Sequence, residues 1–514
     1  MTWAIDSLPP PSRWLWLALF SAIVALAAYL RFYHLGLPSF WHDEVFSLDI
    51  IDRPFGELWG LRKDVHPPLY YMMLQVWFGW VGYDEAGLRL SSVLFSLATL
   101  PAIYMLGRRV AGPWLGLAAL LCFAVSPFAI EYAQELRAYA LLGCIGAWTL
   151  YGFGRLIAAP ERAALPLLRS DRLGWVLVGG GSLLALYTHN LGLLLPFTTS
   201  VVAVALWWPR PERWALARNW AIVHGIVLLL WAPWLPELVG QVRHTTGYSW
   251  IPAPSLLAIL QTELSLGFGL GRFSQPLTWV TVGGLLGLAV LGARALPRPP
   301  RWPAVLLAVF LVPAVGSLAI TFLFSPVYIP RTLIWTGYPV MILVGAGIVL
   351  LLARPRGWRR AASVSLLVLL AAGNGYQLWN DQRGGKNKDD WRDVAVAVAA
   401  LTSPDDLVIV PGLGGDPLAY YLARLSEKSG EAAPLVLDLG AGPTKIGKLL
   451  WHAPEADRYL RVEVPWRGET AGLDSLVAVR FPCHRLVGSS KRSGMILWMY
   501  QRDPACTVKV PGLR

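Results

Sequence analysis

Apolar blocks alternate with short polar segments over roughly the first 380 residues of the chain. A stretch of about 18 or more predominantly apolar residues predicts a helix that crosses a membrane. About eleven such blocks are present, at 14–31, 90–107, 113–130, 138–157, 173–189, 191–208, 219–235, 276–296, 303–324, 332–352 and 361–379. The pattern therefore predicts a polytopic α-helical membrane protein with about 11 or more transmembrane helices.

The short loops between these blocks alternate in charge. Every second loop is rich in arginine, at 108–109, 155–172, 210–218, 294–301 and 354–360. In contrast, the loop at 188–190 has no lysine or arginine, and the loop at 325–331 has one. Cytoplasmic loops carry the excess of positive charge. We therefore expect a multi-pass protein of the cell (inner) membrane with a cytoplasmic N-terminus and, after eleven spans, an extracytoplasmic C-terminus.

The pattern changes after residue 380. A helix is predicted at 390–401, short strands at 407–411, 435–439, 459–464 and 495–500, and a further helix with Asp416 as N-cap and Pro417 as first residue. The glycine-rich stretch 412–415 before that helix matches no specific phosphate-binding fingerprint, so we interpret it as a tight turn. We predict a transmembrane domain at 1–379, whose first outer loop is 32–89, and a small α/β extracytoplasmic domain at 380–514.

Composition agrees with this class of protein. Hydrophobic residues make up 55% of the chain and charged residues only 15%, whereas a typical soluble domain is about 25% charged. The formal net charge of +12 would suit a nucleic-acid partner. Most of that excess lies in the arginine-rich loops, however, so it is a signal of topology and we expect no nucleic acid.

The four cysteines fall into two pairs. Cys122 and Cys144 lie in apolar blocks, where a buried structural thiol is the ordinary role. Cys483 and Cys506 lie in the tail, which the topology places in an oxidising compartment. The strand expected at 495–500 lies between these two, so the chain can double back and bring them together. We expect a disulfide, with an unpaired, buried Cys483 as the alternative.

Three polar clusters are predicted on the outer side, where an ionisable group at the membrane is a candidate functional group. The first is Trp41-His42-Asp43-Glu44, soon after the first block. A group transfer to a hydroxyl or amine needs a base, which a carboxylate can supply. The second carboxylate can orient the acceptor or bind a cation. A solvated acidic turn is the alternative.

The second cluster is the run from Lys63 to Tyr71, which contains Asp64, His66 and the pair Pro67-Pro68. The prolines fix the chain as it enters a helix and hold His66 in a defined place. A histidine here can donate to a phosphate, although capping or packing is the commoner role. The apolar stretch that follows, 69–81, is too short to span a membrane comfortably.

The third cluster lies between the third and fourth blocks and contains Glu135 and Arg137. Such side chains can hold sugar hydroxyls, and a local Glu–Arg pair is the alternative. Arg331, at the outer start of the tenth block, is a lone positive charge. It either reaches the lipid headgroups or holds the phosphate of a lipid donor.

In order and sidedness, these segments resemble the GT-C glycosyltransferases. The likeness is to the branch of protein O-mannosyltransferases, lipid A aminoarabinose transferases and related bacterial enzymes. It rests on Asp43-Glu44 after the first helix, on His66-Pro67-Pro68, on the run 126–142 and on the stretch 390–393 before the outer domain. It is strongest over 30–142. The β-trefoil insertion of the O-mannosyltransferases has no counterpart here, which makes a protein acceptor less favoured.

The resemblance implies a GT-C fold and a membrane glycosyltransferase that moves a hexose or pentose from a polyprenyl-phosphate donor to a lipid, glycan or protein acceptor with inversion. It implies Asp43 as catalytic base, Glu44 as its neighbour in the acceptor site, and His66 near the donor phosphate. We expect Arg331 at the same phosphate, and Asp64, Glu135 and Arg137 at the substrate. No His/Cys set has zinc spacing, and no cofactor is implied. Divalent metal dependence varies across the superfamily and stays open.

Two other classes of protein fit a polytopic chain. A transporter or flippase of a lipid-linked sugar would need polar residues deep within the spans, and these are sparse. A membrane-anchored binding protein would use the tail as its receptor and would not need Asp43. The sequence does not specify the sugar, the acceptor or the oligomeric state.

Overall fold

The computed structural model describes residues 5, 8–60, 66–245, 251, 253–268, 276–297, 301–353, 358–383, 389–410, 415–438, 456–464 and 473–506. The chain divides into two compact units. The first contains Met1–Leu35 and Ile51–Gly384, and the second contains Gly36–Ile50 and Gly385–Arg514. The stretch that carries Asp43 and Glu44 is therefore folded with the C-terminal part of the chain, while the rest of the 32–89 loop belongs to the helical unit.

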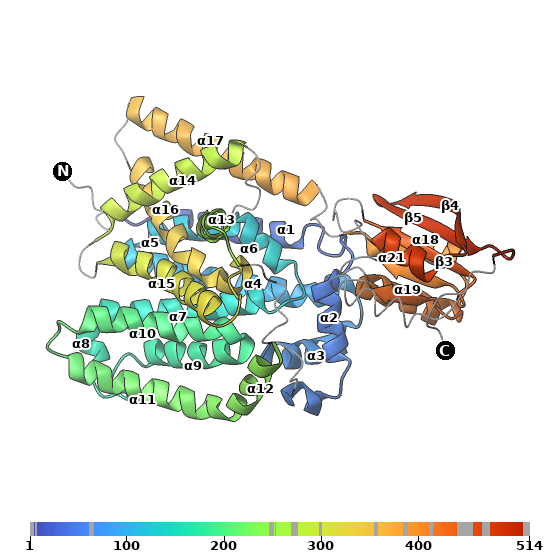
Figure 1. Cartoon of the computed structure of the whole chain (residues 1–514). Helices are drawn as coiled ribbons and strands as arrows, with labels where there is room; N and C mark the ends of the chain where they lie inside the picture. Colours follow the sequence, from blue (N-terminus) through green and yellow to red (C-terminus); the bar gives the residue numbers. More distant parts are fainter. Residues whose placement is uncertain are drawn as a thin grey trace. The chain divides into compact units, whose positions relative to one another are not determined.

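The first unit is helical (Figure 1). Its α-helices are α1 (Arg13–Phe32), α3 (Leu69–Val81), α4 (Glu85–Ala111), α5 (Pro113–Ala124), α6 (Pro127–Ala133), α7 (Tyr139–Ala158), α8 (Pro160–Ala163), α9 (Arg172–Thr188), α10 (Leu194–Trp207), α11 (Arg213–Trp231), α12 (Leu235–Thr245), α13 (Leu256–Phe268), α14 (Pro276–Ala295), α15 (Trp302–Leu323), α16 (Gly337–Leu352) and α17 (Trp358–Arg383). Short 3₁₀ segments are η2 (Phe55–Gly60), η3 (Asn190–Leu193), η4 (Ala232–Trp234) and η5 (Pro330–Thr336).

Many of these helices suit a membrane. Among the described residues, 8 helices are long and apolar enough to cross a membrane, or 9 if the bent pair α5–α6 forms a single span. The 8 helices are Arg13–Phe32, Glu85–Ala111, Tyr139–Ala158, Asn190–Trp207, Arg213–Arg243, Pro276–Ala295, Trp302–Leu323 and Pro330–Leu352. Helices α9 and α17 occupy two further predicted places. The predicted mostly helical membrane fold is confirmed, while the count of eleven stays a prediction.

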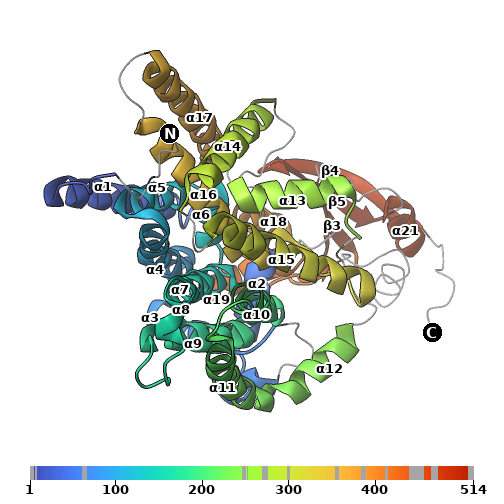
Figure 2. The same ribbon diagram turned by 90° about the vertical axis from the view of Figure 1, so that its left-hand side faces the viewer.

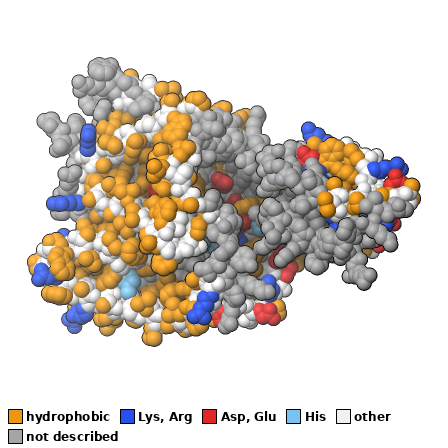
Figure 3. Space-filling model, in the orientation of Figure 1, with side chains coloured by type: hydrophobic (Ala, Val, Ile, Leu, Met, Phe, Trp, Pro, Cys, Tyr) orange, Lys and Arg blue, Asp and Glu red, His pale blue; other side chains and the backbone are white. Residues whose placement is uncertain are grey.

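The surface of this unit agrees with a lipid environment. Hydrophobic side chains cover most of its visible face (Figure 3). Large apolar side chains are widely exposed, among them Leu229 (73%), Val280 (69%) and Val315 (65%). In water such a surface would be an aggregation liability, whereas in a bilayer the lipid chains cover it. Inside the unit, α7 packs against α4 and α9, and α14 packs against α16 (Figures 1 and 2).

A break between α5 and α6 shapes the segment that carries the third polar cluster. The helices meet at 61°, where Ser126 caps α6 by accepting from the Ala129 N–H (3.3 Å). The carbonyls of a broken helix end need donors, because hydrocarbon offers none. Arg31, fully buried at the end of α1, donates to the carbonyls of Ala124 (3.0 Å) and Phe123 (3.2 Å).

Gln134, just after this break, satisfies the other helix end. Its amide donates to the carbonyls of Arg31 and Tyr33, both at 2.9 Å. The last carbonyls of α1 thus obtain partners from the turn between α6 and α7. The end of the first helix and the start of the 135–139 segment are therefore held together by side-chain donors.

The second unit is built on a five-stranded sheet of order β2-β1-β3-β5-β4. The strands are β1 (Leu407–Val410), β2 (Leu435–Asp438), β3 (Arg458–Glu463), β4 (His484–Arg492) and β5 (Met495–Arg502), and the helices are α2 (His42–Ile51), α18 (Trp391–Leu401), α19 (Gly415–Ser429) and α21 (Leu473–Arg480). Strands β1, β2 and β3 pair in parallel, while β3, β5 and β4 pair antiparallel.

The predicted small C-terminal α/β domain is confirmed. All four predicted strands are present, and β4 is an additional one. The core contains Leu407, Ile409, Tyr459, Val477 and Phe481. Helix α19 begins at Gly415, one residue before the predicted N-cap, and the glycines at 412–414 lie outside the described residues.

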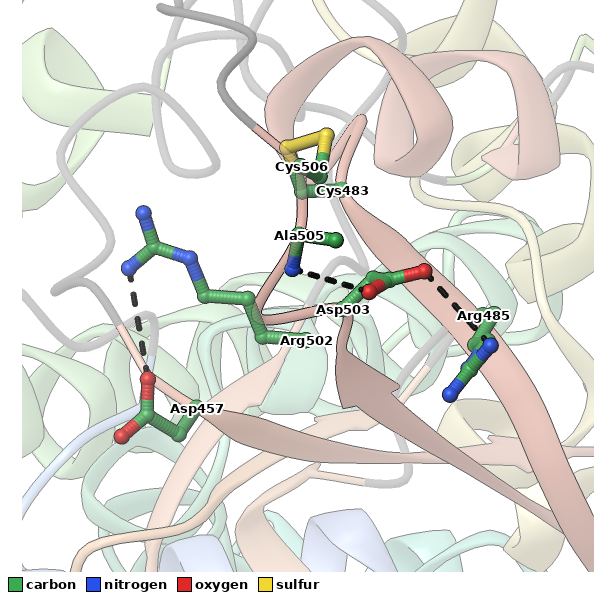
Figure 4. The surroundings of a disulfide bond; sticks show 7 residues. All are labelled: Asp457, Cys483, Arg485, Arg502, Asp503, Ala505 and Cys506. Atoms are coloured by element: carbon green, nitrogen blue, oxygen red, sulfur yellow. Dashed lines mark hydrogen bonds and ion pairs between the residues drawn. A yellow bond between two sulfur atoms is a disulfide. The ribbon is translucent and has the colours of Figure 1, made fainter.

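A disulfide joins Cys483 to Cys506, with Cα atoms 5.5 Å apart, which confirms the predicted bridge (Figure 4). It links the residue before β4 to the turn after β5, and the Asp503 N–H also donates to the Cys483 carbonyl (2.8 Å). Beside it, Arg485 pairs with Asp503 at 3.5 Å. Closing a loop between two positions that are 23 residues apart in the sequence stabilises a small domain by about 3 kcal/mol in the chain-entropy model.

Candidate active site

Two guanidinium groups gather around the ring of Tyr139 in the helical unit. The Cζ atom of Arg331 lies 5.5 Å from the ring centroid and that of Arg137 lies 6.0 Å from it. Arg331 comes from η5, and Arg137 from the turn before α7. Both distances are within the range of cation–π attraction. Two positive charges that would repel each other thus both lie near the same aromatic ring.

Two imidazole rings complete this group. The His66 and His189 centroids are 5.1 Å apart, and His189 lies 6.4 Å from Tyr139. His66, Arg137 and Tyr139 line a small pocket together with Tyr70, Tyr71, Ala138 and Thr188. We call Arg137, Arg331, His66, His189 and Tyr139 the basic cluster. The structure therefore brings together three residues that the sequence analysis named separately, namely His66, Arg137 and Arg331.

His189 was missed as a site residue, because a single histidine in the short loop 188–190 carries no local signal. It is buried, and its Nδ1 accepts the N–H of Leu191 at 3.0 Å. Burial lowers the pKa of His189 well below its usual value, and the nearby His66, Arg137 and Arg331 lower it further. The ring is therefore neutral near pH 7. With Nδ1 accepting, Nε2 carries the proton and can donate to an anion.

Side-chain amides hold the two histidines in place. Asn190 donates to the Gln241 side-chain oxygen at 3.0 Å, and the Gln241 amide donates to the carbonyl of His66 at 3.2 Å. Gln241 belongs to α12 and is almost fully buried. Segments that are far apart in the sequence are thus joined at Gln241, which positions the backbone at His66 and Asn190.

A second anchor lies beside Arg331. The Tyr328 hydroxyl donates to the Glu263 carboxylate at 2.6 Å. Burial raises the pKa of Glu263, while the hydrogen bond from Tyr328 partly offsets this rise. Glu263 lies in α13 and belongs to no motif recognised in the sequence. In the structure it is the partner of Tyr328.

Glu135 lies near the same cluster. It is buried, and its backbone carbonyl accepts from the Ser92 hydroxyl at 2.6 Å. Glu135 and Arg331 both act electrostatically on Tyr132, whose ring is 5.4 Å from that of Tyr139. A carboxylate accepts hydrogen bonds, which is what binding to sugar hydroxyls requires. Asp64, the remaining predicted substrate residue, lies outside the described residues.

Asp43 and Glu44 lie in the first turn of α2, in the second compact unit. Glu44 is fully buried, and its carboxylate turns back to accept the Trp41 N–H at 3.4 Å. Asp43 is only half-buried, and its backbone carbonyl accepts from the Ser47 hydroxyl. Of these two adjacent residues, Asp43 is the more exposed. Among the residues that the structure describes, no group of three or more His, Cys, Asp or Glu side chains is arranged to hold a metal ion.

No protein-family model matches the sequence, and no curated protein does. Solved structures do match. ArnT from Cupriavidus metallidurans in the apo state aligns with 13% identity and a TM-score of 0.59, over 94% of this chain and 97% of that one. The same protein bound to undecaprenyl phosphate gives 14% identity and 0.57, over 94% and 98%. The chain has the GT-C fold.

A third GT-C structure also aligns over most of the chain. The archaeal oligosaccharyltransferase AglB from Archaeoglobus fulgidus, in complex with an inhibitory peptide and a dolichol-phosphate, gives 10% identity and a TM-score of 0.53 over 95% of this chain and 74% of that one. Matches of this extent include residues of both compact units. The GT-C likeness inferred from the sequence is therefore confirmed for the fold.

Proposed function

We propose that this protein is a membrane glycosyltransferase that transfers a sugar from a polyprenyl-phosphate-linked donor to a lipid, glycan or protein acceptor with inversion. The basic cluster carries the proposal: two arginines and two histidines around one aromatic ring, in a GT-C fold, suit a lipid phosphate. The ArnT and AglB structures contain undecaprenyl phosphate and dolichol-phosphate respectively, which supports a polyprenyl phosphate as the carrier.

In the proposed reaction the acceptor hydroxyl or amine gives its proton to Asp43 and attacks the anomeric carbon. The bond from that carbon to the phosphate oxygen breaks, and the polyprenyl phosphate leaves from the opposite face with the electron pair. Glu44 orients the acceptor side, and its burial fixes its own position. A positioned carboxylate base of this kind typically accelerates a reaction by ~10²- to 10⁴-fold.

The basic cluster stabilises the charge that develops on the leaving phosphate. Arg137 and Arg331 supply positive charge, while His66 and the neutral His189 supply directed N–H groups. These donors are already in place, so little reorganisation is needed during the reaction. We assign Glu135 and Asp64 to the sugar hydroxyls.

The proposed location is the cell (inner) membrane, with the N-terminus in the cytoplasm and with Asp43 and the C-terminal domain outside. Alternating arginine loops support this orientation. The Cys483–Cys506 bridge supports it independently, because disulfides persist in oxidising compartments.

The proposal is tested by comparing the affinity of the unchanged protein and of the variants Arg137→Ala and Arg331→Ala for the lipid carrier. Arg213→Ala is the matched control, because the Arg213 guanidinium also lies over an aromatic ring, 5.7 Å from that of Trp214. Radiolabelled undecaprenyl phosphate is bound to full-length protein in nanodiscs. We expect each test variant to weaken binding by about ten- to a hundredfold, the value of one charge-assisted contact. The control should bind normally. Unchanged affinity in both test variants would remove the cluster from the donor site.

Sugar transfer is tested in cells by mass spectrometry of glycolipids and envelope glycans, with and without the gene. We expect a sugar-bearing product that disappears in the deletion and in the Asp43→Asn variant, with normal amounts of variant protein in the membrane. Binding of undecaprenyl phosphate without any gene-dependent product would favour a transporter instead.

A further inference from the structure

The segment with the two acceptor-side carboxylates is held by C-terminal residues. The Ser39 hydroxyl donates to the carbonyl of Asp389 at 2.7 Å and accepts the N–H of Trp391 at 3.0 Å. The next residue, Phe40, donates its N–H to the Tyr421 hydroxyl at 2.7 Å. Ser39 and Phe40 are buried. Residues 36–50 are therefore an integral part of the C-terminal fold.

A direct ion pair continues this attachment to the residue before Asp43. The His42 Nδ1 lies 3.0 Å from the Asp416 carboxylate. Asp416 stands in the first turn of α19. Asp438, at the end of β2, holds the start of α19, because its carboxylate accepts the Gly415 N–H at 3.1 Å. The sheet, α19 and the start of α2 are thus connected by polar contacts.

Electrostatics favour the charged form of this pair. The Asp416 carboxylate beside the ring raises the pKa of His42, burial opposes the rise, and the carboxylates of Asp43 and Asp438 add to it. These three carboxylates come from α19, α2 and β2. The protonated ring of His42 is therefore oriented by the Asp416 carboxylate. His42 immediately precedes Asp43 in the chain.

We propose that Asp416 is a positioning residue for sugar transfer: it holds His42, and through His42 it sets the orientation of the first turn of α2 with Asp43 and Glu44. This inference rests on the proposed function. It makes the C-terminal domain a working part of the catalytic apparatus, since the group that orients the base comes from α19. Displacing a reacting group by about 1 Å can cost roughly a hundredfold in rate.

Hydrogen exchange of the full-length protein in nanodiscs tests the attachment without any substrate. The test variant is Asp416→Asn. The matched control is Asp457→Asn, which removes an exposed carboxylate of the same unit, 4.0 Å from Arg502. We expect amides at 40–48 to exchange about two- to fivefold faster in Asp416→Asn and at the normal rate in the control. Unchanged exchange in Asp416→Asn overturns the proposal whatever the protein's activity.

The pH titration of His42 supplies a second test, because its midpoint would not change if Asp416 had only a general structural role. With ¹³C-labelled histidine, the His42 signal is identified among the eight histidines by its loss in His42→Asn. The His42–Asp416 ion pair is fully formed when His42 is protonated, below its raised pKa, and weakens as pH rises through that pKa. We expect Asp416→Asn to move this titration to lower pH and Asp457→Asn to leave it unchanged. An unmoved titration in Asp416→Asn overturns the proposal.

The gene-dependent product in cells tests the catalytic consequence. We expect Asp416→Asn to lower product about ten- to a hundredfold, Asp416→Glu to restore much of it, and undecaprenyl phosphate binding to stay normal in both. Normal product from Asp416→Asn, while Asp43→Asn abolishes it, overturns the positioning role and leaves the proposed function standing. Normal product from Asp43→Asn overturns the base assignment itself, and the positioning role with it.

Discussion

At the scale of single residues, neighbouring side chains of one type take different tasks because their surroundings differ. Asp43 and Glu44 are adjacent, and successive side chains on a helix point about 100° apart. Glu44 is therefore buried and turned to the Trp41 N–H, while Asp43 stays half-exposed. The same contrast separates His66, which lines a pocket, from His189, which is buried and neutral.

The neutrality of His189 predicts a pH dependence of stability. Its pKa is lowered in the folded protein, so below about pH 6.5 the unfolded chain binds a proton that the folded one does not. Stability should fall as pH decreases through that value. Thermal unfolding in detergent at pH 7 and pH 5 checks this. We expect the loss to be about 2 kcal/mol smaller in His189→Asn, whose side-chain oxygen can replace Nδ1 as acceptor. An equal loss in both proteins would contradict a buried neutral ring.

The sequence allowed His66, Arg137 and Arg331 to be predicted, because each lies beside a recognisable local feature: His66, for example, directly precedes Pro67-Pro68. It did not allow Tyr139 and His189 to be predicted as their partners. Tyr139 is one of 18 tyrosines, and its role depends on guanidinium groups from two separate segments. Such a role is a property of three-dimensional packing, and no spacing along the chain records it.

At the scale of elements, the bend between α5 and α6 depends on a buried cation from another helix. Arg31 donates to the carbonyls of Ala124 and Phe123 and to the Ser96 hydroxyl. Its aliphatic stem packs with the core, and its guanidinium lies 5.0 Å from the Phe123 ring. The sequence predicted one continuous span at 113–130. The structure instead breaks the helix at Ser126-Pro127, with a bend of 61° between α5 and α6.

We therefore predict that Arg31→Leu destabilises the protein by about 2–4 kcal/mol, because buried carbonyl and hydroxyl groups lose their donor. Arg13→Leu, an exposed arginine at the other end of α1, is the matched control and should cost little. Thermal unfolding in detergent compares the two. Equal melting temperatures for both variants would show that the break does not need Arg31.

In the C-terminal unit four strands were predicted correctly from short stretches rich in apolar residues, whereas β4 was not predicted. Its sequence from His484 to Arg492 contains few apolar residues, and most of its side chains are exposed. Among the strands that the structure describes, it lies at the edge of the sheet and pairs with β5 alone. Edge strands rely on backbone pairing, so their sequences need not show a buried face.

At the scale of the whole molecule, the two sets of candidate residues belong to different compact units. The basic cluster lies in the helical unit, and Asp43 lies in the unit with the sheet. The sequence predicted a single boundary near residue 380. It did not predict that residues 36–50 fold with the C-terminal domain, because the contacts of Ser39 and Phe40 join positions 350 and 381 residues apart.

The orientation of the whole chain is predicted from its loops and is testable by labelling. Cys122 and Cys144 are replaced by alanine, and single cysteines are placed at Glu57, Ser429 and Arg210. We expect an impermeant thiol reagent on intact spheroplasts to label the first two positions and to label Arg210→Cys only after lysis, since arginine-rich loops stay in the cytoplasm. Labelling of Arg210→Cys alone in intact cells would invert the topology and exclude the proposed mechanism.

The division of the C-terminal unit into two stretches of chain also sets the order of events during biosynthesis. Residues 36–50 leave the ribosome early, but their partners at 385–514 follow only after residues 51–384. At about 5–20 residues per second, this interval lasts about 20–70 s. During that time Ser39, Phe40 and His42 are already synthesised without the groups that later bind them. The segment with Asp43 therefore reaches its final form among the last parts of the protein, after most of the membrane helices have been made.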